Sequence, residues 1–125
     1  MFRALGQEVM ALAAAQGIAP VGFNGFDPAA YAPRASKAAA LASVAAMVAH
    51  NRKTAKTHSG IWRDLAVRKR KTEVDAQIAP MVDIGRELGV PVPALARLVE
   101  LIHDIEDGRR EQSVATLDHL VPVCA

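Results

Sequence analysis

The sequence predicts an all-α fold, a bundle of six or seven helices. Hydrophobic residues make up 51% of the 125 residues but aromatic residues only 4%, so the interior must be built from Ala, Val, Leu, Ile and Met. Alanine, the best helix former, is abundant, and no stretch alternates with the period of a strand for long enough to form one. Because there is no internal repeat and no linker, we expect one helical domain over residues 1–125.

The first half of the chain predicts two helices with a short helical turn between them. Residues 3–16 have apolar positions at helical spacing, and Gly17 suits the left-handed residue after a helix. Asp27 and the proline after it predict a turn of helix through Tyr31. Ser36 then caps an Ala-rich helix to about residue 50, which we expect to be buried on most sides and central in the bundle.

The second half predicts a helix from Ser59 or Gly60 to about residue 68, followed by a longer one. Thr72 with Asp75 forms a weak capping box for that longer helix, which runs to about residue 88.

Proline and glycine residues punctuate the rest of the chain. Pro80 predicts a kink in the helix that contains it. A Gly-Val-Pro-Val-Pro loop follows, and Pro93 opens an amphipathic helix that Gly108 ends. A last short helix is expected over residues 112–120, closed by Pro122.

Composition excludes several classes of protein. The net charge of +2 is too small to indicate nucleic-acid binding by itself. The single cysteine, Cys124, rules out an internal disulfide and favours a reducing, cytoplasmic setting. No secretory signal is recognisable, and the apolar stretch over residues 38–49 is too short to span a bilayer. We therefore expect a cytoplasmic protein that binds neither nucleic acid nor membrane.

The basic run over residues 68–71, Arg-Lys-Arg-Lys, has three interpretations. It is either a solvated helix end, where cations meet the negative end of the helix dipole, or a patch that faces a carboxylate or phosphate. Nucleic-acid binding is the least favoured, because the chain lacks aromatic residues to stack on bases.

The histidines do not predict a metal site. His50, His58, His103 and His119 never pair at i, i+4, and no cysteine pair exists. Cys124 lies too close to the terminus to be held as a nucleophile.

Ser59, Asp64 and Glu73 are the candidate substrate-binding residues. In the structural interpretation, Ser59 caps its helix, Asp64 pairs with a nearby arginine or lysine, and Glu73 caps the next helix. In the functional interpretation, a hydroxyl and a carboxylate at two helix starts hydrogen-bond a hydroxy or keto acid, whose carboxylate is balanced by backbone amides and basic side chains. The residues alone leave both open.

Three motifs stand in order along this part of the chain. They are Lys56-Thr57-His58-Ser59-Gly60-Ile61-Trp62-Arg63-Asp64-Leu65, Arg70-Lys71-Thr72-Glu73-Val74-Asp75 and Gly89-Val90-Pro91-Val92-Pro93. In order and spacing they resemble the C-terminal helical domain of ketopantoate reductases (2-dehydropantoate 2-reductases), a fold like the C-terminal domain of 6-phosphogluconate dehydrogenase. The similarity extends to the opening helix.

The resemblance implies a function at the interface of two domains. Family members reduce a 2-keto acid with NADPH in pantothenate biosynthesis, and an N-terminal Rossmann domain binds the dinucleotide. By resemblance, Ser59 contacts the hydroxyl or carboxylate of the substrate, Asp64 braces the turn, and Glu73 lies near the reacting carbonyl and the nicotinamide ribose. The implied partners are a Rossmann domain, in cis or in trans, and the 2-keto acid.

The sequence also departs from the family pattern. The family's catalytic lysine has no counterpart, since Lys37 and Lys56 stand in other contexts, and the glycine-rich dinucleotide loop is absent. We therefore expect no catalytic, cofactor-binding or metal-binding residue in this chain, and no reductase activity from it alone. The family's commoner Ser-Ser is Ser59-Gly60 here, which removes one hydroxyl.

The predicted function is therefore that of the C-terminal substrate-binding and oligomerisation domain of an NADPH-dependent 2-keto acid reductase. The alternative is a stand-alone, non-enzymatic helical interaction module derived from that family. In that case, apolar patches would be covered by self-association, with a homodimer as the simplest form.

Overall fold

The computed structural model describes all 125 residues, which form six α-helices and three short 3-10 or π segments without a named strand. This confirms the predicted all-α class. The chain divides into two compact units, Phe2–Thr57 and His58–Ala125. That the whole chain acts as one domain stays a prediction. None of the helices has the length and apolar character that crossing a membrane requires.

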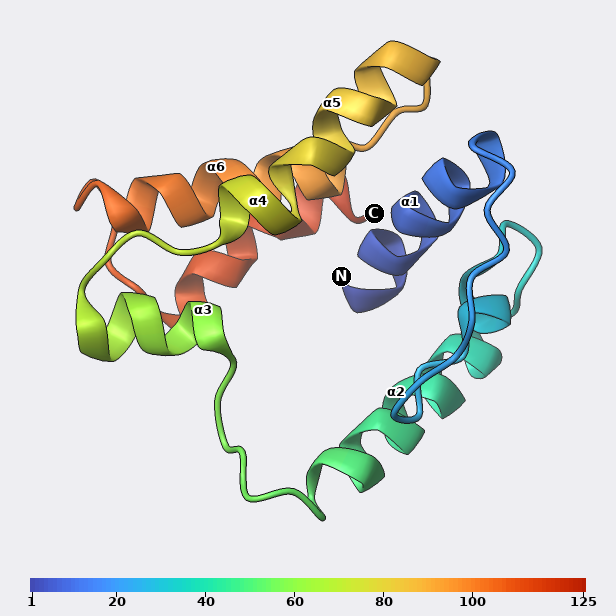
Figure 1. The fold of residues 1–125 in the computed structure, drawn as a ribbon, viewed down its shortest axis with the longest axis horizontal. Coiled ribbons are helices and arrows are strands. Elements are labelled where there is room, and N and C mark those ends of the chain that lie inside the picture. The colour runs from blue at the N-terminus through green and yellow to red at the C-terminus, as the bar shows by residue number, and fades with distance from the viewer. The chain divides into compact units, whose positions relative to one another are not determined.

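The first unit contains α1 (Phe2–Ala15), the 3-10 segment η1 (Pro28–Tyr31) and α2 (Lys37–Asn51), drawn from blue to teal in Figure 1. Its helix boundaries are set locally, as the sequence predicts. The Asp27 carboxylate accepts a hydrogen bond from the Ala29 N–H at 3.0 Å, and the Ser36 hydroxyl accepts one from the Ala39 N–H at 3.0 Å. Gly17 follows α1 with a φ of 66°, the left-handed conformation that favours glycine.

An aromatic residue forms the centre of the first unit. Tyr31 is fully buried and stacks on Phe26 with ring centroids 5.0 Å apart. The Ser43 hydroxyl of α2 accepts a hydrogen bond from the Asp27 N–H at 3.0 Å, which holds the Gly- and Pro-rich loop against the helix.

The expectation that α2 is buried on most sides is wrong. Only Ala40 and Ser43 of this helix are buried, while Leu41 and Val48 are exposed. One face of α2 meets η1 and the loop before it, and the small alanine side chains elsewhere need no cover.

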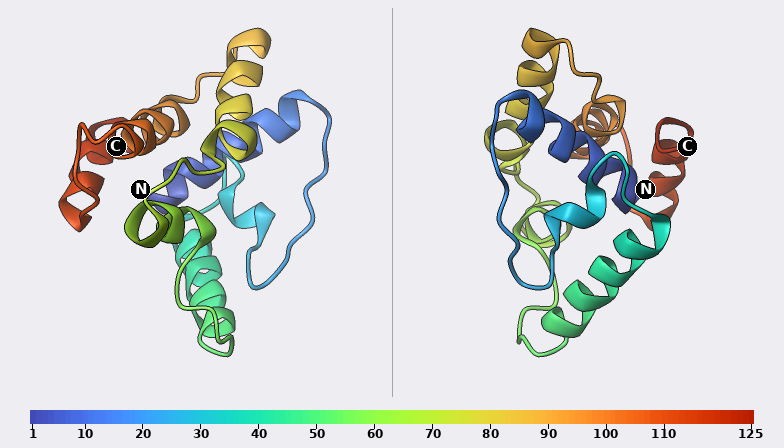
Figure 2. Two further views of the ribbon diagram at one scale, coloured as in Figure 1. Left: turned by 60° about the vertical axis from the view of Figure 1, so that its left-hand side comes forward. Right: turned by 90° about the vertical axis from the view of Figure 1, so that its right-hand side faces the viewer.

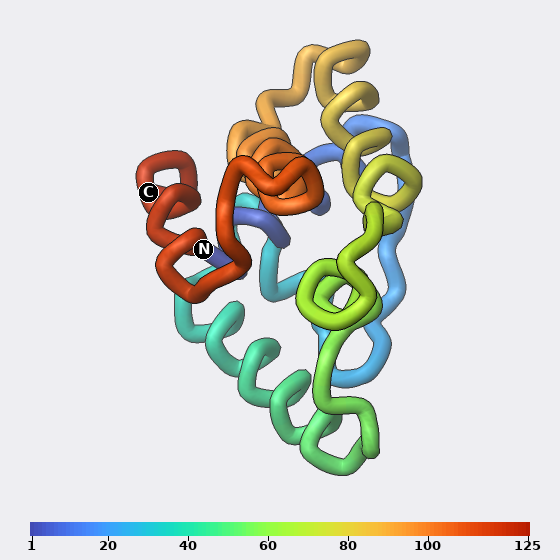
Figure 3. The backbone as a smooth tube through the Cα atoms, turned by 90° about the vertical axis from the view of Figure 1, so that its left-hand side faces the viewer, coloured from blue at the N-terminus to red at the C-terminus, as the bar shows by residue number.

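The second unit is built around α6 (Pro93–Glu106). Figures 1 and 2 show α4 and α5 along one side of α6 and the C-terminal segment η3 (red) along another, and Figure 3 shows the same neighbours from the side. Val99 and Ile102 of α6 form a buried cluster with Val74. The other elements are α3 (Gly60–Arg63), the π segment η2 (Asp64–Arg68), α4 (Val74–Gln77), α5 (Ala79–Leu88) and the 3-10 segment η3 (Val114–Val123).

Two boundaries in this unit differ from expectation. The kink predicted at Pro80 is a break, because Ile78 leaves ideal helical geometry with a φ of −113° and Pro80 lies in the first turn of α5. The last element is a 3-10 segment that begins at Val114 and continues through Pro122, instead of a helix over 112–120.

Candidate functional site

Ser59 begins α3 as its N-cap. Its hydroxyl accepts a hydrogen bond from the Trp62 N–H at 3.1 Å, and its extended backbone leads the chain into the helix. This confirms the structural interpretation of Ser59. The residue is exposed, so the hydroxyl hydrogen remains available to another acceptor. Its contact with substrate stays a prediction.

Asp64 holds the turn that carries the basic run. The carboxylate is buried, and its Oδ1 atom accepts hydrogen bonds from Arg68 Nη1 at 2.8 Å and from Arg70 Nε at 2.9 Å. The chain reaches this arrangement because Lys69, between the two arginines, adopts a left-handed conformation with a φ of 51°.

The two arginines also set the charge state of Asp64. The hydrogen bond from Arg68 lowers the pKa of the Asp64 carboxyl below its ordinary value, and the hydrogen bond from Arg70 and the charges of both arginines add to this, against the opposing effect of burial. The pairing confirms the structural interpretation of Asp64 as the partner of nearby basic residues. Its assignment as a substrate-binding residue stays a prediction.

Glu73 is exposed at the start of α4, where its carboxylate accepts a hydrogen bond from the Gln77 side chain. The backbone on either side of it is held by Thr72. The Thr72 N–H and hydroxyl both donate to Glu106 Oε1 at 2.7 Å, and the same hydroxyl accepts from the Val74 N–H at 3.1 Å. Glu73 is thus presented from a backbone fixed by α6, and its contact with substrate stays a prediction.

The capping box expected between Thr72 and Asp75 does not form. The Thr72 hydroxyl donates a hydrogen bond to Glu106 instead. Asp75 pairs with His103 of α6, whose Nε2 atom lies 2.7 Å from Asp75 Oδ1. Two contacts distant in sequence therefore replace one local contact. Both attach the motif that contains Glu73 to α6.

Ser59, Asp64 and Glu73 do not line either of two pockets found in this unit. One is a charged pocket with a volume of about 750 Å³, lined by Lys69, Arg70, Arg109 and Arg110 among others. The other is an apolar groove of about 480 Å³ between α3, α6 and η3, with Trp62 and Leu120 in its lining. They adjoin, because Leu65, Ala66, Ile105 and Gln112 line both.

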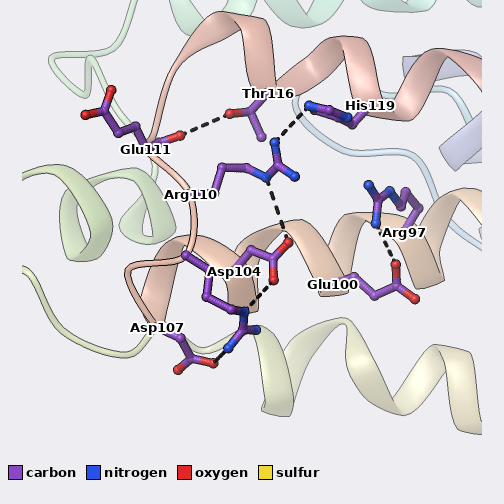
Figure 4. Close-up of polar contacts among 9 residues, drawn as sticks. Arg97, Glu100, Asp104, Asp107, Arg110, Glu111, Thr116 and His119 are labelled. Carbon is purple, nitrogen blue, oxygen red and sulfur yellow. Dashed lines mark hydrogen bonds and ion pairs between the residues drawn. The ribbon is translucent and has the colours of Figure 1, made fainter.

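The loop after α6 forms one wall of the charged pocket, and Figure 4 shows the polar contacts of this loop. Arg109 Nε donates to Asp104 Oδ1 at 2.9 Å, and Arg109 Nη1 pairs with Asp107 Oδ2 at 2.6 Å. The hydrogen bond from Arg109 lowers the pKa of Asp104, and the hydrogen bonds to Asp104 and Asp107 raise the pKa of Arg109. Arg110 faces the same carboxylate, with its Nε atom 3.8 Å from Asp104 Oδ2, and its Nη1 atom lies 2.8 Å from His119 Nε2 (Figure 4).

Sequence reasoning missed the partners supplied by α6 and its loop. Glu106 carries no local signal, because its role depends on Thr72, which lies 34 residues away. The Arg109-Arg110 pair directly after Gly108 is a signal that the sequence does carry. It is a basic dipeptide at a helix end, comparable with the basic run over residues 68–71.

The polar side chains of this unit can bind a small polar ligand. No group of three or more His, Cys, Asp or Glu side chains is placed to hold a metal ion. The exposed Ser59 hydroxyl and Glu73 carboxylate can each hydrogen-bond a polar ligand, and Asp64 keeps the turn between them fixed.

Comparison with known proteins gives one finding. The family model described as ketopantoate reductase PanE/ApbA C terminal matches residues 1–106. Neither the curated proteins nor the solved structures give a significant match. The matched segment contains Ser59, Asp64 and Glu73 and ends at Glu106, so Arg109 and Arg110 lie outside it.

Proposed function

Because this chain belongs to the ketopantoate reductase family, whose C-terminal domain matches residues 1–106, we propose that it forms the substrate side of an NADPH-dependent 2-keto acid reductase. The observation that carries the proposal is this match, whose residues 1–106 include Ser59, Asp64 and Glu73. The substrate would be ketopantoate or a related 2-keto acid, and the setting would be pantothenate biosynthesis.

In this proposal, Ser59 and Glu73 contact the substrate, and Asp64 holds the turn between them in position. The Ser59 hydroxyl donates its hydrogen to the carboxylate or hydroxyl of the keto acid while its oxygen accepts from the Trp62 N–H. The Glu73 carboxylate accepts from a substrate or ribose hydroxyl, on a backbone that Thr72 and Glu106 hold rigid. Asp64 fixes the turn between them through Arg68 and Arg70.

In this proposal, the dinucleotide is bound by another domain. The sequence contains no glycine-rich fingerprint of the kind that holds a pyrophosphate between a strand and a helix. NADPH would supply the hydride from a Rossmann domain, joined in cis or associated in trans. The roles proposed for this chain are therefore binding and positioning.

The test is the rate of ketopantoate-dependent NADPH oxidation, measured for this chain alone and for the protein at its native size in its source cells. We expect no activity from the chain alone and activity from a native protein that carries a Rossmann domain. Robust oxidation by the isolated 125-residue chain, or none by the native protein, would refute the proposal. An immunoblot gives the native size.

The second candidate is a non-enzymatic helical interaction module that associates with itself. The observation that favours it is a set of exposed apolar side chains, among them Leu41 at 60% and Val67 at 67% of full exposure. A homodimer would cover such side chains. Sedimentation of the chain distinguishes the candidates in part, because a strictly monomeric chain argues against the module.

A further inference from the structure

One wall of the charged pocket belongs to the segment that the family model matches, and the other wall lies beyond that segment. Lys69 and Arg70 come from the turn after η2, while Arg109 and Arg110 come from the loop after α6, beyond residue 106. The pocket therefore includes residues that the family match does not cover, and it contains none of Ser59, Asp64 and Glu73.

Most charges around the pocket are already paired, and these pairs orient the cations. Asp64 holds Arg70, and Asp104 and Asp107 hold Arg109. None of these three carboxylates lines the pocket. Among the lining side chains, Lys69, Arg70, Arg109 and Arg110 are positive, and only Glu106 and Glu111 are negative. Glu106 Oε1 is already engaged by two hydrogen bonds from Thr72. Because the positive lining side chains outnumber the negative ones, the lining favours an anion.

Two of the cations have unused hydrogen-bonding capacity. The Arg110 Nε atom makes no hydrogen bond, since the Asp104 Oδ2 atom is 3.8 Å away, and because protein atoms cover it a ligand reaches it only when the Arg110 side chain turns toward the pocket. Lys69 makes no ion pair, although it lines the pocket. A buried donor without an acceptor costs free energy unless a ligand or water satisfies it.

Lys69 is also held in a conformation that glycine would adopt more readily. Its φ of 51° and ψ of 47° place it in the left-handed region, where a side chain is disfavoured. A glycine is the usual residue at this position after a helix. A lysine at this position makes the fold less stable than a glycine would. A function of the lysine side chain would explain why the chain has a lysine there.

We propose that the charged pocket binds the phosphate of a small phosphomonoester whose apolar part lies toward the adjoining groove. Cations that approach from two segments suit a tetrahedral dianion, which accepts hydrogen bonds from several directions. The volume of about 750 Å³ is far larger than one phosphate and is typical of a small-molecule site. Leu65 and Ile105 supply apolar surface shared with the groove.

The test is a titration of the full chain with phenyl phosphate, followed by NMR and calorimetry, with phenol as the neutral analogue. We expect saturable binding of phenyl phosphate with shifts at Lys69 and Arg110, weakened by salt, and no binding of phenol at the pocket. No saturable binding at millimolar concentration, or equal binding of phenol, would overturn the proposal.

Lys69→Gly separates binding from folding. The substitution relieves the left-handed strain, so we expect the thermal midpoint to rise by roughly 3–6 °C while the affinity for phenyl phosphate falls about tenfold. Arg86→Gln is the matched control, because Arg86 is exposed on α5 and pairs only with Asp83; its affinity should stay within about twofold. Unchanged affinity in Lys69→Gly contradicts the proposal.

Discussion

Glu106, the last residue of α6, accepts hydrogen bonds from both the backbone N–H and the hydroxyl of Thr72, each at 2.7 Å, across 34 residues of sequence. Thr72 directly precedes Glu73. The position of the candidate substrate-binding carboxylate is therefore set by a helix that is distant in sequence.

Removal of Glu106 should loosen this connection. Hydrogen bonds to a charged group contribute about 1.5–3 kcal/mol each, and two are lost in Glu106→Ala. We expect the free energy of unfolding to fall by about 3 kcal/mol, measured by urea denaturation. Glu100→Ala is the control on the same helix, since Glu100 forms only an exposed pair with Arg97 and should change stability by less than about 1 kcal/mol. Equal effects would contradict the assignment.

Tyr31→Phe should stabilise the chain. The Tyr31 hydroxyl is buried without a hydrogen-bond partner, while its ring stacks on Phe26. Phenylalanine keeps the ring and removes the unsatisfied hydroxyl, so we expect the free energy of unfolding to rise by about 1 kcal/mol. A loss of stability in thermal or urea denaturation would show that the hydroxyl has a partner in solution.

Gly25→Ala should be far more damaging than Gly89→Ala. Both glycines have positive φ, 86° and 66°. A Cβ at Gly25 would lie 2.6 Å from the Ala46 carbonyl, whereas nothing lies within 4 Å of one at Gly89. We expect a loss of about 3 kcal/mol or more at Gly25 and about 1 kcal/mol at Gly89. Similar losses in the two variants would contradict the packing of this loop against α2.

Asp64 should contribute to stability only above acid pH. Arg68 and Arg70 lower its pKa in the folded chain, so the unfolded chain binds the proton more readily. The contribution is present above the unfolded pKa, about 3.9, and is lost as the pH falls toward the lower folded pKa. Asp64→Asn should therefore destabilise the chain at pH 7 and flatten the decline below about pH 4. A parallel pH profile of unfolding free energy in both proteins would exclude this role.

Features set by neighbouring residues could be predicted from the sequence. The caps at Asp27, Ser36 and Ser59 and the left-handed Gly17 depend only on the next few residues. The all-α class follows from composition and periodicity for the same reason. The pairing of Asp64 with basic residues was also expected, because Arg68 is one helical turn away.

Features set by distant residues could not be predicted. The prediction of a capping box at Thr72 was wrong, because Thr72 hydrogen-bonds Glu106 and Asp75 pairs with His103. The exposure of α2 was missed because an Ala-rich sequence is compatible with burial or exposure. The charged pocket requires two segments to be brought together, and no local pattern shows that.

The most direct test of the proposed function is the effect of Glu73→Gln on NADPH oxidation with ketopantoate by the protein at its native size. Glu87→Gln serves as the control, because Glu87 is exposed on α5 and lines neither pocket. If Glu73 binds at the reacting end of a 2-keto acid, kcat/KM should fall by about 100-fold or more, while the control keeps its rate. An unchanged kcat/KM in Glu73→Gln, or a native protein that does not reduce ketopantoate or any related 2-keto acid, would contradict the account.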